Sequence, residues 1–159
     1  MAVQRHMAPE PAGQLKLRLW VRLLRAVRVV EVDLRRRLRA EFGETLPRFD
    51  VMAALARQTT GMTMTDVSRH LMVSNGNVTG IVDRLVTEGL VVRIANAKDR
   101  RATFVRLTPK GLRHFARMAE AHEAWVNEIL ARFSREQSQA LIGSLDTLTA
   151  ATRSGVQRP

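Results

Sequence analysis

The chain has 159 residues, no cysteine and a formal net charge of +11. The lack of cysteine excludes disulfides, cysteine-based zinc sites and redox sensing through thiols. A small domain this basic most often binds a polyanion, with nucleic acid as the leading candidate and an anionic membrane as the rival. No apolar run reaches transmembrane length. Because residues 1–13 lack the apolar core of a secretion signal, we expect a cytoplasmic protein.

The first expected element is a long helix over residues 14–42. Its apolar residues recur at spacings of three and four, which is typical of a helix with a buried face. A second stripe makes this face broader than a small domain normally covers, so we expect a partner subunit to cover it. Gly43 is expected to end the helix. The two stripes are Leu15, Leu19, Leu23, Val27, Val30, Leu34 and Leu38, and Leu17, Trp20, Leu24 and Val27.

Three shorter helices should follow, each with a recognisable start. Pro47 is expected near the first position of the second helix, where its missing N–H costs nothing. Thr63 and Asp66 fit a capping box for the third helix. Ser74 is expected to cap the fourth helix, and Gly89 lies where a glycine would end it.

The apolar period then changes from 3.6 to 2, which predicts strands over 90–94 and 103–107 around a polar, basic tip. Thr108-Pro109 begins a long helix, and Ser134 with Gln137 forms a capping box for the last one. The fold class is therefore mainly α with a small two- or three-stranded β wing: a winged helix-turn-helix with long N- and C-terminal dimerisation helices. The expected organisation is a flexible arm (1–13), a dimerisation helix (14–45), a DNA-binding lobe (46–111), dimerisation helices (112–154) and a tail (155–159).

The helix after Ser74 has the properties of a recognition helix. A major groove about 12 Å wide admits one helix, which must bury one side and offer small polar groups on the other. Val78, Ile81, Val82 and Leu85 supply the inner face. The alternative is that Asn75-Gly76-Asn77 is only a turn. The predicted DNA contacts here are Ser74 for a phosphate, and Asn75, Asn77, Thr79 and Arg84 on the outer face.

The tip of the hairpin supplies a second predicted DNA contact. Arg100 or Arg101 can enter a minor groove, where the negative potential favours arginine. Asp99 can support the wing by orienting that guanidinium through a charge-assisted pair, and Lys98 adds a further positive charge. The alternative is a solvated charge cluster, which is the usual fate of such a run.

These segments together resemble the MarR family of bacterial regulators. The matching stretches are Met64-Thr65-Asp66-Val67-Ser68, then Val78 to Leu85, Glu88-Gly89-Leu90-Val91, Asp99-Arg100-Arg101, and Val105 to Gly111. The resemblance covers nearly the whole chain in element order. It implies an obligate dimer built from the first and last helices, and an effector pocket between the dimer helices and the DNA-binding lobe. Gly76-Asn77 departs from the family pattern and leaves the operator open.

The segment Leu71 to Gly80 also looks like that of MarR regulators of hydroxycinnamate breakdown, which respond to the acyl-CoA. The expected effector is therefore a small aromatic acid or its coenzyme A thioester, which releases the protein from DNA. The alternative is that the residues assigned to it are ordinary core and a solvated face. The predicted effector contacts are Trp20, Leu24, Phe49 and Met52 around an aromatic ring, and Arg36, Arg37 and Arg39 on phosphates.

The sequence gives little support to an enzyme, which needs a convergent set of acids, bases or nucleophiles. His114 and His122 are eight residues apart, too far for the usual metal pair, so we expect no metal and no cofactor. The second function class considered is a helical protein that binds RNA or an anionic membrane without sequence preference. The run Arg35-Arg36-Arg37-Leu38-Arg39 suits that alternative, but tyrosine is absent and no aromatic platform accompanies it.

Overall fold

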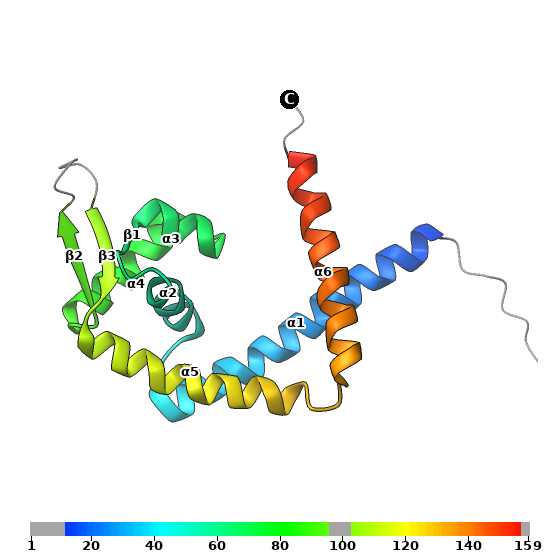
Figure 1. The fold of residues 1–159 in the computed structure, drawn as a ribbon, viewed down its shortest axis with the longest axis horizontal. Coiled ribbons are helices and arrows are strands. Elements are labelled where there is room, and N and C mark those ends of the chain that lie inside the picture. The colour runs from blue at the N-terminus through cyan, green and yellow to red at the C-terminus, as the bar shows by residue number, and fades with distance from the viewer. Residues whose placement is uncertain (1–11, 96–102, 157–159) are drawn as a thin grey trace, which may run out of the picture. The chain divides into compact units, whose positions relative to one another are not determined.

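The computed structural model describes residues 12–95 and 103–156 (Figure 1). The chain divides into two compact units, the first ending at His122 and the second beginning at Glu123, so that helix α5 contributes to both. In chain order the elements are α1 (Ala12–Phe42), α2 (Leu46–Ala56), β1 (Met62–Thr63), α3 (Met64–Leu71), α4 (Asn75–Thr87), β2 (Val91–Ala95), β3 (Thr103–Leu107), α5 (Pro109–Ile129) and α6 (Arg135–Val156). The predicted fold class is confirmed.

Helix α1 begins two residues before the predicted start and ends at the predicted glycine. Gly43 has a φ of 67°, and its N–H donates to the carbonyl of Arg39 at 3.1 Å. Only the C-terminal part of α1 is buried in the protomer, through Leu34 and Leu38. Most of the apolar side chains before it are more than half exposed: Leu15, Leu17, Leu19, Trp20, Val21, Val27, Val29 and Val32.

The core of the first unit lies among α2, α3, α4 and the sheet. Each fully buried aliphatic side chain contributes about 1.5–3 kcal/mol of transfer free energy, so the burial of this set is a large favourable contribution to the stability of the first unit. The inner face of α4 is buried as predicted at Val78, Val82 and Leu85. The fully buried side chains are Leu38, Val51, Met52, Leu55, Val67, Val78, Val82, Leu85, Val91, Val105 and Met118.

The sheet has three antiparallel strands in the order β1-β3-β2, with Met62 paired to Val105 and Val91 paired to Leu107. Strand β1 has only two residues, too few for a period to be visible in the sequence. Strand β2 begins at Val91 and not at Leu90, because the N–H of Leu90 donates to the carbonyl of Leu85 at 2.9 Å. That bond ends helix α4 and leaves Leu90 outside the ladder.

The second unit contains the end of α5 and all of α6. The predicted capping box begins α6: Ser134 Oγ accepts from the N–H of Gln137 at 3.2 Å, and Gln137 Oε1 accepts from the N–H of Ser134 at 2.9 Å. The apolar side chains Leu141, Ile142, Leu145 and Leu148 are 40–59% exposed. Within residues 12–95 and 103–156, no helix is long and apolar enough to cross a membrane.

Candidate nucleic-acid interface

Helices α3 and α4 are joined by a tight turn through Met72, Val73 and Ser74. Thr63 Oγ1 accepts from the N–H of Asp66 at 3.1 Å, which caps α3 as predicted. At the other end Met72 has a φ of 54°, a left-handed conformation that costs a non-glycine residue about 1–2 kcal/mol. The N–H of Val73 bonds to the carbonyl of Ser68 at 3.2 Å, and Ser68 Oγ donates back to the carbonyl of Val73. These bonds fix the turn that orients α4.

Ser74 occupies the N-cap position of α4, but its side chain makes no capping hydrogen bond. The prediction of a Ser74 cap is therefore wrong in its chemistry and right in its position. The extended backbone of Ser74, with a φ of −67° and a ψ of 147°, is enough to begin the helix. Within the part of the chain that the structure describes, the hydroxyl of Ser74 has no hydrogen-bond partner.

The outer face of α4 is small and exposed. Gly76 and Gly80 lie on it, and a Cβ atom added at either would have no neighbour within 4 Å. Thr79 is exposed, but its hydroxyl donates to the carbonyl of Asn75 at 2.8 Å, which leaves its methyl group as the unused part. Asn77 is exposed toward the flank of α4, where it lines a cavity of about 110 Å³ with Asp50 of α2 and Leu71 of α3. The face that a DNA duplex can approach is therefore centred on the glycines.

One acidic side chain on this face is neutralised by the wing. Arg93 of β2 donates to Asp83 of α4 at 2.5 Å, although the sequence interval of ten residues gave no signal for the pair. Arg84 is exposed next to Asp83 and has no partner among residues 12–95 and 103–156. The pair joins β2 to α4, and Arg84 remains exposed beside it. The predicted wing residues Lys98, Asp99, Arg100 and Arg101 lie outside the described residues.

The segment after the wing attaches α5 to the end of α4. Gly89 has a φ of 70°, and its N–H donates to Val86 O at 2.9 Å, so α4 ends at the predicted glycine. Thr108 Oγ1 accepts from the N–H of Gly111 at 3.0 Å and donates to the carbonyl of Gly89 at 2.7 Å. Lys110 Nζ donates to the carbonyl of Glu88 at 2.9 Å. The Thr-Pro-Lys-Gly sequence thus caps two helices at once.

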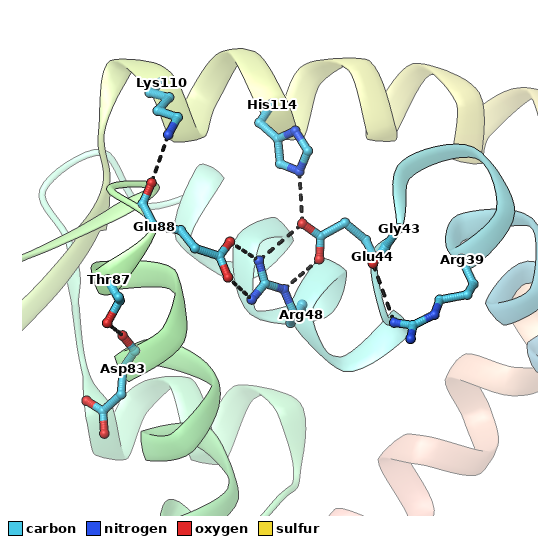
Figure 2. A network of polar contacts seen from close by, with 9 residues as sticks. All are labelled: Arg39, Gly43, Glu44, Arg48, Asp83, Thr87, Glu88, Lys110 and His114. Carbon is cyan, nitrogen blue, oxygen red and sulfur yellow. Dashed lines mark hydrogen bonds and ion pairs between the residues drawn. The ribbon is translucent and has the colours of Figure 1, made fainter.

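A network of ion pairs lies beside the end of α4 (Figure 2). The Arg48 guanidinium stands between Glu44 and Glu88, with Nε 2.5 Å from Glu44 Oε2 and Nη2 2.5 Å from Glu88 Oε2. Hydrogen bonds from Arg48 lower the pKa of Glu88, and Glu88 raises the pKa of Arg48. His114 Nε2 lies 3.0 Å from Glu44 Oε1. Sequence reasoning missed this network because Glu88 lies 40 positions from Arg48 and His114 lies 70 positions from Glu44; only the Glu44–Arg48 pair is local, at a spacing of four.

The predicted effector residues lie in different environments. Leu24 lines a groove along α1 whose other lining residues also belong to α1, and Trp20 is exposed. Phe49 and Met52 are buried in the core. Arg36 and Arg37 both pair with Asp33, lowering its pKa, while Arg39 Nη1 donates to the carbonyl of Gly43 at 3.5 Å. The four apolar residues were predicted as one slot, and the buried pair would have to repack to join it.

Two other features of the first unit can hold or sense a ligand. Phe49 stacks on His122 with ring centroids 4.6 Å apart and lies 5.6 Å from Phe115, and burial lowers the pKa of His122. A cavity of about 410 Å³ lies between the end of α2, both wing strands and the start of α5, with Arg106 as the only cation in its lining. Within the described ranges, no three of His, Asp and Glu gather as a metal site would require.

Comparison with known proteins agrees with this architecture. Residues 42–102 match the sequence model of the MarR family. A MarR family transcriptional regulator from Silicibacter pomeroyi is 35% identical, with a TM-score of 0.75 over 91% of this chain and 99% of that one. BldR from Sulfolobus solfataricus is 25% identical, with a TM-score of 0.80 over 89% and 99% of the two chains. The transcriptional activatory protein BadR from Rhodopseudomonas palustris is 31% identical over 84% of this chain and 80% of its own length. This chain belongs to the MarR family of DNA-binding transcriptional regulators, which are not enzymes.

Proposed function

We propose that this protein is a cytoplasmic, homodimeric regulator that recognises a pseudo-palindromic operator with helix α4 and the wing. The observation that carries the proposal is the outer face of α4, where Gly76 and Gly80 leave open space. Glycine weakens a helix interior, where Gly80 lies, by about 0.8–1 kcal/mol relative to alanine, and no described residue comes close enough to Gly76 or Gly80 to exclude a side chain. Close approach of a duplex supplies a reason. Asn75, Asn77 and the methyl group of Thr79 then lie near base edges.

The second subunit supplies the cover that α1 and α6 lack. Both helices expose large apolar side chains in the protomer, and extensive exposed apolar surface marks an interaction site. A two-fold axis through such an interface places two recognition helices about 34–36 Å apart, one turn of the duplex. That spacing gives the operator its two half-sites.

Gel shifts with an operator duplex and a scrambled duplex test the DNA-binding proposal. Arg101→Ala should weaken both complexes about equally and lower the salt dependence, because groove and phosphate electrostatics do not depend on sequence. Asn77→Ala should cost about 1–3 kcal/mol on the operator alone. Equal affinity of the unsubstituted protein for both duplexes, or for single strands, would favour the alternative of a non-specific RNA- or membrane-binding protein.

We further propose that a small aromatic acid or its coenzyme A thioester releases the protein from DNA. Release requires the ligand to prefer the state that does not bind DNA, since equal affinity shifts no population. Two places suit such a ligand. One is the predicted set of Trp20, Leu24, Phe49 and Met52 with Arg36, Arg37 and Arg39. The other is the cavity of about 410 Å³, whose size is typical of small-molecule sites and whose Arg106 has no partner among the described residues.

Calorimetry with p-coumaroyl-CoA, feruloyl-CoA and the free acids tests the effector. Arg106→Gln should abolish binding if the cavity is the site, and Arg36→Gln should weaken it if the arginines of α1 hold the phosphates. No heat from any of the four, with unchanged DNA affinity, would remove the effector proposal and leave the regulator. A promoter–reporter assay decides the sign of regulation: we expect repression that the effector relieves.

A further inference from the structure

Arg48 makes two bidentate contacts, one to each side. Its Nε and Nη2 lie 2.5 and 3.1 Å from the two carboxylate oxygens of Glu44, at the corner between α1 and α2. Its Nη1 and Nη2 lie 2.9 and 2.5 Å from the two oxygens of Glu88. We call this arrangement the Arg48 bridge (Figure 2). A guanidinium held on both sides has its orientation fixed as well as its position.

The bridge reaches the recognition helix at Glu88, the residue that follows its last helical residue. Glu88 is the C-cap of α4, and the next two N–H groups close the helix onto Val86 and Leu85 at 2.9 Å each. These hydrogen bonds hold the backbone around Glu88 against the last turn of α4, so a contact that fixes Glu88 also fixes the end of α4. The opposite end of the bridge is equally fixed, since Glu44 is buried and follows the left-handed Gly43.

Helix α5 contacts both ends of the bridge. His114 Nε2 lies 3.0 Å from Glu44 Oε1, and Lys110 Nζ donates to the backbone carbonyl of Glu88 at 2.9 Å. The corner between α1 and α2, the end of α4 and the start of α5 therefore meet through Arg48. These are the elements that join the DNA-binding lobe to its long helices.

Stabilising the contact between these elements is not a sufficient explanation for the Arg48 bridge. The Arg48 side chain is 14% exposed and the Glu44 side chain 9%, and withdrawing such charges from water offsets much of their attraction. Apolar residues of the same volume would often hold the elements together as well. What an ion pair adds is a single allowed geometry, because a bidentate contact fails when either partner rotates.

We propose that Arg48 is a positioning residue that sets the angle at which α4 presents its outer face to the major groove. Arg48 is not itself a DNA contact in this proposal, since carboxylates occupy two N–H edges of its guanidinium. The inference rests on the operator recognition proposed above and names a residue on which that recognition depends. Binding to an arbitrary duplex tolerates a changed angle, because phosphate contacts do not depend on register. Binding to the operator does not tolerate it.

The test compares Arg48→Met with the unsubstituted full-length protein on operator and scrambled duplexes of equal length at one salt concentration. Arg48→Met should lose about tenfold in operator affinity while its affinity for the scrambled duplex stays within about twofold. Arg48→Lys keeps the charge without the bidentate geometry and should recover part of the loss. Arg57→Met is the matched control, because it removes the same charge from an exposed arginine at the other end of α2. It should leave the operator-to-scrambled ratio unchanged.

Glu88→Gln is the second variant, and it tests the same positioning role if Arg48→Met does not fold. It preserves the side chain's size and should lower the ratio about threefold, within the range of one partly exposed pair, with Glu41→Gln as the control for lost negative charge. Urea unfolding of each variant separates stability from positioning. An unchanged ratio in folded Arg48→Met or Glu88→Gln would overturn the inference. An unsubstituted protein without operator preference would overturn the proposed function and this inference with it.

Discussion

At the scale of single residues, Gly80 separates stability from function. Gly80→Ala should raise the free energy of unfolding by about 0.5–1 kcal/mol, because alanine favours a helix interior and a Cβ atom there meets nothing within 4 Å. The same methyl group should lower operator affinity by about 1 kcal/mol or more, since it lies on the face offered to base edges. Urea unfolding and gel shifts measure the two effects.

Gly143 of α6 is the control for Gly80, because its added Cβ atom meets nothing within 4 Å in the protomer and α6 lies outside the proposed DNA-binding lobe. Gly143→Ala should be stabilising and leave the affinity of each bound dimer for DNA unchanged. If Gly80→Ala binds the operator as tightly as the unsubstituted protein does, α4 is not the recognition helix.

Asp50 has a pKa raised by burial and, to a smaller extent, by Glu31. A carboxyl whose folded pKa lies above its unfolded value stabilises the fold below about pH 4 and loses that contribution as the pH rises through the folded pKa. Asp50→Asn should therefore be more stable than the unsubstituted protein at pH 7 and lose this advantage at pH 3. Urea unfolding across this range measures the difference.

Asp33 supplies the opposite sign for comparison. Hydrogen bonds from Arg36 and Arg37 lower its pKa, so its contribution is present above about pH 4 and is lost as the pH falls through the lower folded value. Asp33→Asn should be the less stable protein at pH 7. If Asp33→Asn and Asp50→Asn changed stability in the same direction at pH 7, the opposite pKa shifts of Asp33 and Asp50 would be contradicted.

At the scale of elements, the start of α5 passes very close to the backbone that connects α4 to β2. A Cβ atom at Gly111 would lie 2.0 Å from the carbonyl oxygen of Leu90, a backbone atom that cannot move aside alone. Gly111→Ala should therefore lower the free energy of unfolding by about 1–3 kcal/mol or more. Urea unfolding beside Gly143→Ala, which adds the same methyl group in open space, measures the cost. A neutral Gly111→Ala would contradict the described contact between α4 and α5.

Local signals predicted the elements well and the contacts between them poorly. Helix starts and ends depend on residues only a few positions apart, so they can be recognised in the sequence. Examples are Gly43, Gly89, Thr63 and the Ser134 capping box. The short strand β1 left no visible period. Asn77 is exposed as predicted, and the small cavity that it lines with Asp50 of α2 and Leu71 of α3 could not be read from the helical period.

The candidate site shows the same division. The outer face of α4 followed from helical period alone, with Val78, Val82 and Leu85 buried opposite it. The Arg48 bridge and the Arg93–Asp83 pair join elements that are distant or differently structured, so no periodicity reports them. The effector residues were chosen by type along two helices, and residue type does not distinguish core from cavity: Met52 is fully buried.

At the scale of the whole molecule, the exposed apolar surface of α1 and α6 predicts a stable dimer. Sedimentation at micromolar concentration should give twice the chain mass of 17.9 kDa. Val29→Asp, which charges a side chain 63% exposed in the protomer, should dissociate the dimer, whereas Met72→Asp, at 91% exposed, should not. A monomer without any substitution would contradict the proposed interface.

Footprinting on the DNA beside its own gene shows whether this protein reads a two-fold operator through α4. We expect two protected half-sites with related, inverted sequences, whose centres lie about one helical turn apart. Protection should persist in the presence of excess unrelated duplex. Uniform protection regardless of sequence, or a footprint that unrelated duplex removes, would show that the protein does not read a two-fold operator.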